Sequence, residues 1–181
     1  MAVLEGFAPI GSGEPRILIL GSFPSVASLE RGEYYGHARN QFWGILGSVL
    51  GFSPDAPYAE RASALAAAGI ALWDLIASCE REGSLDDAIR AARANPNDRF
   101  LAAKPRVERL ALNGGKAAAS FAEHFAPELK KLAIGAESEW RPPSAPGRIV
   151  SVVRLPSTSP VPTRDYRSAL DKLPLWSAFL A

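Results

Sequence analysis

The fold of this chain is decided by residues 16–25, which read RILILGSFPS. Four consecutive apolar residues at 17–20, two of them β-branched, are typical of a strand that is buried on both faces, as strands of parallel sheets are. Gly21 and Pro24 mark the end of this strand. In open α/β sheets, ligands bind beyond the carboxyl ends of the strands. We therefore expect the turn at 21–25 to border a binding site.

Further apolar runs predict three more strands, at residues 70–76, 107–112 and 148–154. The segments between the strands favour helices. Apolar residues recur at helical spacing from about residue 39 to Leu50, and a second helical run covers 117–125. Because strands alternate with helices, the sequence predicts an α/β fold, a three-layer α/β/α sandwich with a mostly parallel four-stranded central sheet.

Two stretches are rich in glycine or proline and predict irregular structure. They are the lead-in at residues 1–15 and the segment 127–146. A final helix is expected after Thr163, and Pro174 should kink or end it.

The composition agrees with one globular domain over residues 1–181, with 48% hydrophobic and 22% charged residues. The sequence has no apolar run of about 18 residues and no signal-peptide pattern, so we expect a cytoplasmic, monomeric protein without a membrane segment. The single cysteine, Cys79, excludes an internal disulfide, a four-cysteine zinc site and an iron–sulfur cluster. A net charge of +1 gives no indication about nucleic acid.

Several enzyme classes lack their motifs in this sequence. It has no G-x-G-x-x-G after a strand, no P-loop and no G-x-S-x-G turn. Its two histidines, His37 and His124, have no second ligand at metal-binding spacing, so no metal is expected. A triad of Ser22, His37 and Asp74 can be drawn, but nothing in the sequence positions these three side chains.

Two motifs together resemble the uracil-DNA glycosylase superfamily. The first is GSFPSVASLERGEYYGHARNQFW at 21–43, and the second is LPSTSP at 155–160. The resemblance is greatest to the branch that acts on deoxyinosine (hypoxanthine) in DNA. Phe23 stands where the mismatch enzymes carry a catalytic asparagine, and Leu155 stands where relatives carry histidine or asparagine. The hypoxanthine branch shares both departures, and its catalytic asparagine falls on Asn40 here.

This resemblance implies a monofunctional DNA glycosylase of base excision repair. Such an enzyme flips a deaminated base, here with hypoxanthine preferred, out of DNA and hydrolyses its N-glycosidic bond, leaving an abasic site and using no cofactor. Its partner is DNA that contains a deaminated base. Three alternatives are open: a glycosylase that prefers uracil or G:U/T mismatches, a non-catalytic protein that binds damaged DNA, and a small-molecule hydrolase acting on a nucleoside or nucleotide.

The resemblance places the chemistry on Asn40. An amide cannot act as a general base near neutral pH, but it can orient a water molecule and donate a hydrogen bond to the charge that develops on the leaving purine. Asn40 also stands at the predicted start of a helix, where asparagine is a favoured N-cap. A side chain bonded to its own backbone would be unavailable to the substrate, so a catalytic role and a capping role are both open.

The residues expected to bind the base are Phe23, Tyr35, Ser22 and Asn113. Phe23 and Tyr35 offer flat apolar faces, and the resemblance gives Tyr35 the stacking position; without the resemblance, both could equally be core aromatics. Ser22 lies in the first turn, and Asn113 follows a strand whose end would reach the same site.

The residues expected to contact the DNA backbone are Ser25, Ser157, Thr158, Ser159, Arg154 and Arg164. The loop 157–159 lies between two prolines, and its small residues can approach the backbone closely while hydroxyl and amide groups bind phosphate. A proline-braced turn and ordinary solvated arginines are the alternatives. Trp73 and Asp74 are interpreted as structural.

Overall fold

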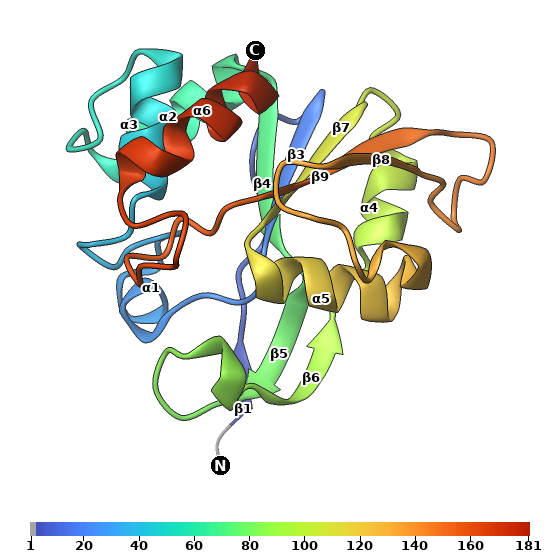
Figure 1. Ribbon diagram of the computed structural model, residues 1–181, viewed down its shortest axis with the longest axis horizontal. Helices are drawn as coiled ribbons and strands as arrows, with labels where there is room; N and C mark the ends of the chain where they lie inside the picture. Colours follow the sequence, from blue (N-terminus) through green and yellow to red (C-terminus); the bar gives the residue numbers. More distant parts are fainter. Residues whose placement is uncertain (1–2) are drawn as a thin grey trace.

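The computed structural model describes residues 3–181, apart from the side chain of Asp86. Its centre is a six-stranded mixed sheet (Figure 1). From one edge to the other, the strands are β2 (Ile10–Gly11), β4 (Ile70–Asp74), β3 (Ile17–Gly21), β7 (Arg109–Asn113), β9 (Val150–Leu155) and β8 (Glu137–Trp140). Strand β3 lies in the interior of this sheet, and Leu18, Ile19 and Leu20 are each 0% exposed. This agrees with the prediction of a strand buried on both faces.

The four inner strands, β4, β3, β7 and β9, run parallel and are the four strands predicted from the sequence. The predicted number of strands was wrong, because β2 and β8 add antiparallel edges from two stretches expected to be irregular. These edge strands are only two and four residues long. Strands this short show little periodicity of their own, and they form because the neighbouring strand offers unpaired backbone groups.

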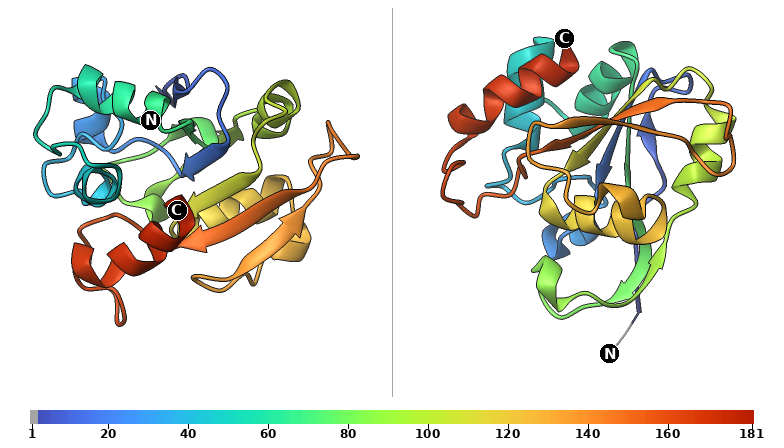
Figure 2. Two further views of the ribbon diagram at one scale, coloured as in Figure 1. Left: turned by 90° about the horizontal axis from the view of Figure 1, so that it is seen from above. Right: turned by 45° about the vertical axis from the view of Figure 1, so that its right-hand side comes forward.

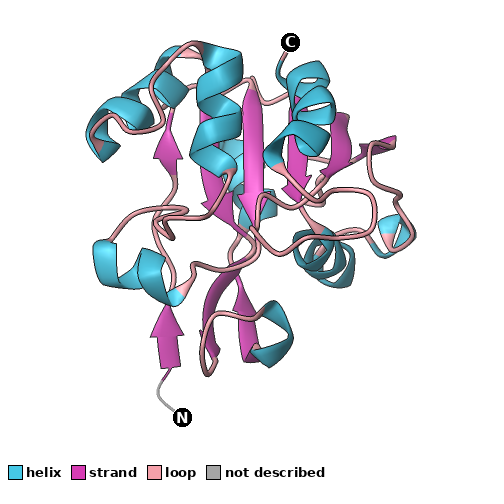
Figure 3. Ribbon diagram, turned by 60° about the vertical axis from the view of Figure 1, so that its left-hand side comes forward, coloured by secondary structure: helices cyan, strands magenta, loops and turns pink. Residues whose placement is uncertain are grey.

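A second sheet lies beyond the carboxyl ends of the inner strands, with a gathering of loops between the two sheets (Figure 3). Its strands are β1 (Val3–Glu5), β5 (Ile76–Glu80) and β6 (Arg90–Ala94), in the antiparallel order β1-β5-β6. The apolar run predicted as one strand is therefore divided between the two sheets, at Leu75. There, the backbone N–H groups of Leu75 and Ile76 donate to the carbonyls of Gly21 and Ser22, at 2.9 and 3.1 Å.

Helices cover both faces of the central sheet and give the molecule three layers (Figures 1 and 2). One side carries α2 (Phe42–Leu50), α3 (Tyr58–Ala67) and α6 (Ala169–Leu180), and the other carries α4 (Asn97–Ala103) and α5 (Gly115–His124). The short helices α1 (Val26–Arg31), η1 (Asp86–Ala88) and η2 (Pro127–Leu129) lie in the connections. Across the described residues, none of the helices has the length and apolar character needed to cross a membrane.

The starts of α2 and α6 differ from the prediction, and α5 covers Gly115–His124 where 117–125 was predicted. Helix α2 begins at Phe42 and not near residue 39, because the backbone N–H of Asn40 donates to the His37 carbonyl at 2.8 Å and closes a separate turn. Helix α6 begins after Ser168, where the Asp171 Oδ2 accepts the backbone N–H groups of Arg167 and Ser168, each at 2.8 Å, and the helix continues through Pro174. The turn between His37 and Asn40 places Asn40 just ahead of α2.

Candidate active site

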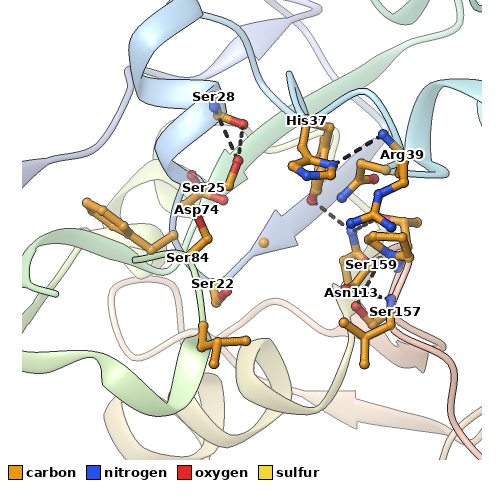
Figure 4. Close-up of a pocket in the computed structure, with 18 residues that line it drawn as sticks. Ser22, Ser25, Ser28, His37, Arg39, Asp74, Ser84, Asn113, Ser157 and Ser159 are labelled. Carbon is orange, nitrogen blue, oxygen red and sulfur yellow. Dashed lines mark hydrogen bonds between the residues drawn. The ribbon is translucent and has the colours of Figure 1, made fainter. Parts of the chain in front are cut away.

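A pocket opens among the loops at the carboxyl ends of the inner strands (Figure 4). Its volume is about 260 Å³, just below the usual range for drug-sized ligands, so it suits a ligand as small as a nucleobase. It is lined by Gly21, Ser22, Phe23, Ser25, Ser28, Tyr35, His37, Arg39, Asn40, Asp74, Ser84, Leu85, Asn113, Ser157, Thr158, Ser159, Pro160 and Val161. The two signature motifs, far apart in the sequence, therefore form one site.

The side chain of Asn113 ties three parts of this pocket together. Its Nδ2 donates to the Tyr35 hydroxyl at 2.8 Å and to the Thr158 Oγ1 at 3.0 Å. Its Oδ1 accepts the backbone N–H of Thr158 at 3.0 Å. Thr158 is 1% exposed, so its two bonds to Asn113 are buried. They hold the loop of residues 156–160, called the late loop below, against the end of β7. Asn113 lines the pocket as predicted, but both ends of its amide are engaged with the protein.

Tyr35 is held in an unfavourable backbone conformation. Its φ is 54°, in the left-handed region that non-glycine residues rarely adopt. Its ring stacks on Phe42 with centroids 4.0 Å apart and planes 18° apart. The neighbouring Gly36 N–H donates to the Ser28 hydroxyl at 3.0 Å, and the Trp43 indole donates to the Tyr34 carbonyl at 2.9 Å. Surroundings that impose such strain are typical of a functional position.

Asn40 lines the pocket and also bonds to the first residue of α2, from the position before the N-cap residue Gln41. Its Oδ1 accepts the backbone N–H of Phe42 at 3.0 Å. Only the oxygen of an amide can accept, so this bond directs the oxygen to the helix and leaves the Nδ2 donors for the pocket. Within the part of the chain that the structure describes, no protein group accepts from this Nδ2. The two roles left open by the sequence are therefore compatible, because each uses a different end of the side chain.

The inner end of the pocket is formed by Asp74, which the sequence analysis took to be structural. Asp74 is 3% exposed, and it lies opposite Gly21 in the register of β3 and β4. Its backbone carbonyl accepts from the side chains of Asn95 and Asn97, at 2.9 and 3.2 Å. One signal could have found it: Asp74 is the single polar residue in an otherwise apolar run, and it ends a strand at the ligand-binding edge.

Gly21 provides the space in which Asp74 and Tyr35 meet. A Cβ atom added at Gly21 would lie 2.3 Å from the Asp74 Oδ1 and 3.0 Å from the Tyr35 hydroxyl oxygen. Both groups therefore lie directly over the glycine backbone. Burial raises the pKa of the neighbouring Tyr34 far above its ordinary value, and the charge of Asp74 raises it further. Tyr34 consequently stays neutral, and its hydroxyl donates to the Ala8 carbonyl at 3.1 Å.

A buried lysine of α6 supports the pocket from behind. Lys172 is 2% exposed, and its Nζ donates to the Gln41 Oε1 at 2.7 Å and to the Ser159 carbonyl at 2.8 Å. The Gln41 N–H also donates to the Thr158 carbonyl at 2.9 Å. Burial lowers the pKa of the Lys172 ammonium below its ordinary value, and the charge of Asp171 opposes this. Lys172 thus joins the residue after Asn40 to the late loop.

We expect Lys172→Met to lower the free energy of unfolding by about 1–3 kcal/mol, because two partly buried acceptors lose their donor. Urea denaturation measures this loss of stability, with the exposed Lys130→Met as the matched control.

The pKa of Lys172 also predicts a dependence on pH. Between its lowered value in the folded chain and its ordinary value of 10.5, the unfolded chain binds more protons than the folded chain. The stability difference between wild type and Lys172→Met should therefore grow in favour of the wild type as pH rises through that window. Equal stability of Lys172→Met and Lys130→Met would contradict the supporting role of Lys172.

Nine of the predicted site residues line this pocket, namely Ser22, Phe23, Ser25, Tyr35, Asn40, Asn113, Ser157, Thr158 and Ser159. Arg154 and Arg164 are not among the lining residues. Arg154 donates to the Leu132 carbonyl at 3.1 Å, and its Nη2 lies 3.2 Å from where a Cβ on Gly115 would stand, at the start of α5. Arg164 is exposed.

His37 and Arg39 line the pocket without having been predicted to bind anything. The Arg39 backbone N–H donates to the His37 Nδ1 at 3.2 Å (Figure 4). The imidazole of His37 therefore turns this nitrogen toward its own loop. In the part of the chain that the structure describes, no group of three or more His, Cys, Asp or Glu side chains could hold a metal ion.

Comparisons with known proteins agree with the geometry. A statistical model of the family described as "Uracil DNA glycosylase superfamily" matches residues 8–179. A protein of Methanosarcina barkeri named hypoxanthine DNA glycosylase is 35% identical over 113 residues, which are 62% of this chain and 72% of that protein. One of the same name from Methanosarcina acetivorans is 33% identical over 116 residues, 64% of this chain and 73% of that protein. A solution NMR structure from Methanosarcina acetivorans, provisionally named a uracil DNA glycosylase, matches with a TM-score of 0.74 at 27% identity, covering 99% of this chain and 97% of the other.

Proposed function

The chain belongs to the uracil DNA glycosylase superfamily, and from this premise we propose that it removes hypoxanthine from DNA by hydrolysing the N-glycosidic bond. The observation that carries the proposal is the pairing of a donor and an acceptor in one pocket of nucleobase size. Asn40, whose amide nitrogen is a donor, and the buried Asp74, whose carboxylate is an acceptor, both line it, together with the aromatic residues Phe23 and Tyr35. A flat base that bears an N–H group meets complementary chemistry there.

Asp74 supports a preference for deaminated bases. An ionised carboxylate only accepts hydrogen bonds. Hypoxanthine carries an N–H on the ring edge where adenine has a bare acceptor nitrogen, so hypoxanthine can donate to Asp74 and adenine would face it with a second acceptor. Buried polar groups that lose their partner discriminate strongly against the wrong ligand. The names of the two similar Methanosarcina proteins favour hypoxanthine over other bases that carry such an N–H.

Asn40 is given the catalytic role. When the glycosidic bond breaks, negative charge develops on the departing purine ring, and a donor that is already in place stabilises it without reorganisation. Its bond to Phe42 fixes the amide so that Nδ2 is such a donor. None of the described residues that line the pocket is a lysine, which supports simple hydrolysis to an abasic site over a Schiff-base mechanism.

Contacts with the DNA backbone are assigned to the hydroxyl and amide groups of Ser25, Ser157 and Ser159, which line the pocket. Arg154 can add positive charge from beside the pocket, because its guanidinium lies at the N-terminus of α5. We assign Asn113 and Thr158 a structural role, which is to hold the late loop in place, because their polar atoms bond to each other.

The proposal is tested with duplexes that carry a single hypoxanthine, uracil, xanthine or adenine at one position. After incubation with the purified protein, alkali cleaves the strand wherever an abasic site was left. We expect cleavage at hypoxanthine, at least about a hundredfold faster than at adenine, and an intact strand before alkali. Faster cleavage at uracil would favour the mismatch-type alternative, and binding of damaged duplex without any cleavage would favour a non-catalytic protein. A preparation made in the same way from cells without the protein serves as the control against a contaminating glycosylase.

A further inference from the structure

Two buried asparagines outside the pocket hold the backbone of Asp74. Asn95 follows β6 and Asn97 begins α4, with Pro96 between them. The Nδ2 groups of Asn95 and Asn97 donate to the Asp74 carbonyl, at 2.9 and 3.2 Å. A carbonyl only accepts hydrogen bonds, so each amide turns its nitrogen toward Asp74. Asn95 is 7% exposed and Asn97 is 0% exposed, and neither lines the pocket.

These bonds lie where the chain leaves the central sheet for the second sheet. Asp74 is the last residue of β4, and Ile76 is the first residue of β5. The Asn95 backbone N–H donates to the Leu75 carbonyl, and the Asn97 N–H donates to the Asn95 carbonyl, each at 2.8 Å. Both asparagines are therefore held beside the crossing by their own backbone. A rotation of the peptide group that follows Asp74 would break two buried hydrogen bonds, which lowers stability.

The direction of the Asp74 carboxylate depends on this backbone. A Cβ added at Gly21 would lie 2.3 Å from the Asp74 Oδ1, so this oxygen lies directly over the glycine. A rotation of the Asp74 backbone would move the carboxylate away from this place at the inner end of the pocket. In an active site, a misplacement of about 1 Å can cost a factor of about 10² in rate. The bonds to the Asp74 carbonyl therefore bear on the chemistry of the pocket.

Asn97 has a second feature that distinguishes it from an ordinary core residue. Its Oδ1 is buried and has no hydrogen-bond partner among the residues that the structure describes. A buried acceptor without a donor lowers stability. An apolar side chain of similar size would avoid this loss, but it could not donate to the Asp74 carbonyl. Departures of this kind from a fully satisfied core are typical of functional sites.

We propose that Asn95 and Asn97 are positioning residues that fix the Asp74 carboxylate where it can accept the N–H of the flipped base. Neither asparagine lines the pocket, so both act through the backbone of Asp74. This inference rests on the proposed function, because it pairs the N–H of hypoxanthine with Asp74.

The test replaces asparagine with leucine, which has a similar size and no donor. In single turnover on a hypoxanthine duplex, Asn97→Leu should be slower by about tenfold. The double variant Asn95→Leu/Asn97→Leu should be slower by about a hundredfold, because the carboxylate loses first one anchor and then both. Binding to a duplex with a stable abasic analogue should be unchanged, since that DNA offers no base to Asp74. A loss of folded protein would weaken this binding as well, so the two measurements separate positioning from stability.

Leu101→Val is the matched control. It removes one methylene group from a buried leucine that lies on the same helix as Asn97 and does not line the pocket. It should excise hypoxanthine at the wild-type rate. An unchanged rate in the double variant, or an equal loss in Leu101→Val, would overturn the positioning role. If Asn97→Leu does not fold, Asn95→Ala takes its place, and the same tenfold loss is expected because one anchor is again removed.

If the wild type excises no base at all, the proposed function fails, and the crystal structure of Asn97→Leu then decides the positioning role. An Asp74 carboxylate displaced from its place over Gly21 would support this role without catalysis. A carboxylate in the same place as in the wild type would overturn it.

Discussion

Asn40→Asp should fold with near-native stability and excise hypoxanthine at least about a hundredfold more slowly than the wild type. Aspartate keeps an oxygen for the Phe42 N–H, so the start of α2 retains its cap. It replaces the Nδ2 donor with a second, negatively charged oxygen beside a ring that is gaining negative charge. Loss of one such preorganised donor typically costs on the order of 10²–10³ in rate, or about 3 kcal/mol.

Asn40→Ala is the companion variant, because it removes the donor and the cap together. It should lose a similar factor in rate and, in addition, about 1 kcal/mol in the free energy of unfolding. Single-turnover excision and urea denaturation separate the two effects. Near-native rates in both variants would show that Asn40 only caps α2, and the catalytic group would then have to be sought at Ser22 or Asp74.

Gly21→Ala should reduce excision by at least about a hundredfold. The added methyl group would lie 2.3 Å from the Asp74 Oδ1 and 3.0 Å from the Tyr35 hydroxyl, so both must move away from the inner end of the pocket. A misplacement of about 1 Å at an active site can cost a factor of about 10². The Tyr35 side chain is held by its stacking on Phe42 and its bond to Asn113, so a loss of about 1–3 kcal/mol in stability is also expected.

Gly44→Ala is the matched control for this experiment. Gly44 lies inside α2, and an added Cβ there would have no other atom within 4 Å. This change should stabilise the protein by about 0.5–1 kcal/mol, as alanine does in a helix, and leave excision unchanged. If Gly21→Ala excised hypoxanthine at a rate close to that of Gly44→Ala, the role assigned to Asp74 would be wrong.

Local patterns were sufficient for much of the fold. The apolar residues at 17–20 were predicted as a buried strand, and they form all of β3 except its last residue, Gly21. The inner parallel strands were predicted in the same way, and so were the helices expected at about 39–50 and 117–125, which the structure has at 42–50 and 115–124. Such elements bury their own side chains in a regular pattern, so the spacing of their apolar residues can be recognised in the sequence. The edge strands were missed because they depend on their neighbours for backbone hydrogen bonds.

The sequence by itself determined the inner strands, the edge of the sheet at which the pocket lies, and the motif residues Tyr35 and Asn40 that line it. The tertiary structure decided where each polar group lies and what it bonds to. Asp74 enters the pocket because β4 pairs with β3 in the register that sets it against Gly21, and Lys172 reaches Gln41 from 131 residues away. For Asn40, only the folded chain shows that the amide oxygen bonds to the start of the helix, which makes a capping role and a catalytic role compatible. Hydrogen bonds act over about 3 Å in space, without regard to separation in sequence, so these roles become visible only when the chain is folded.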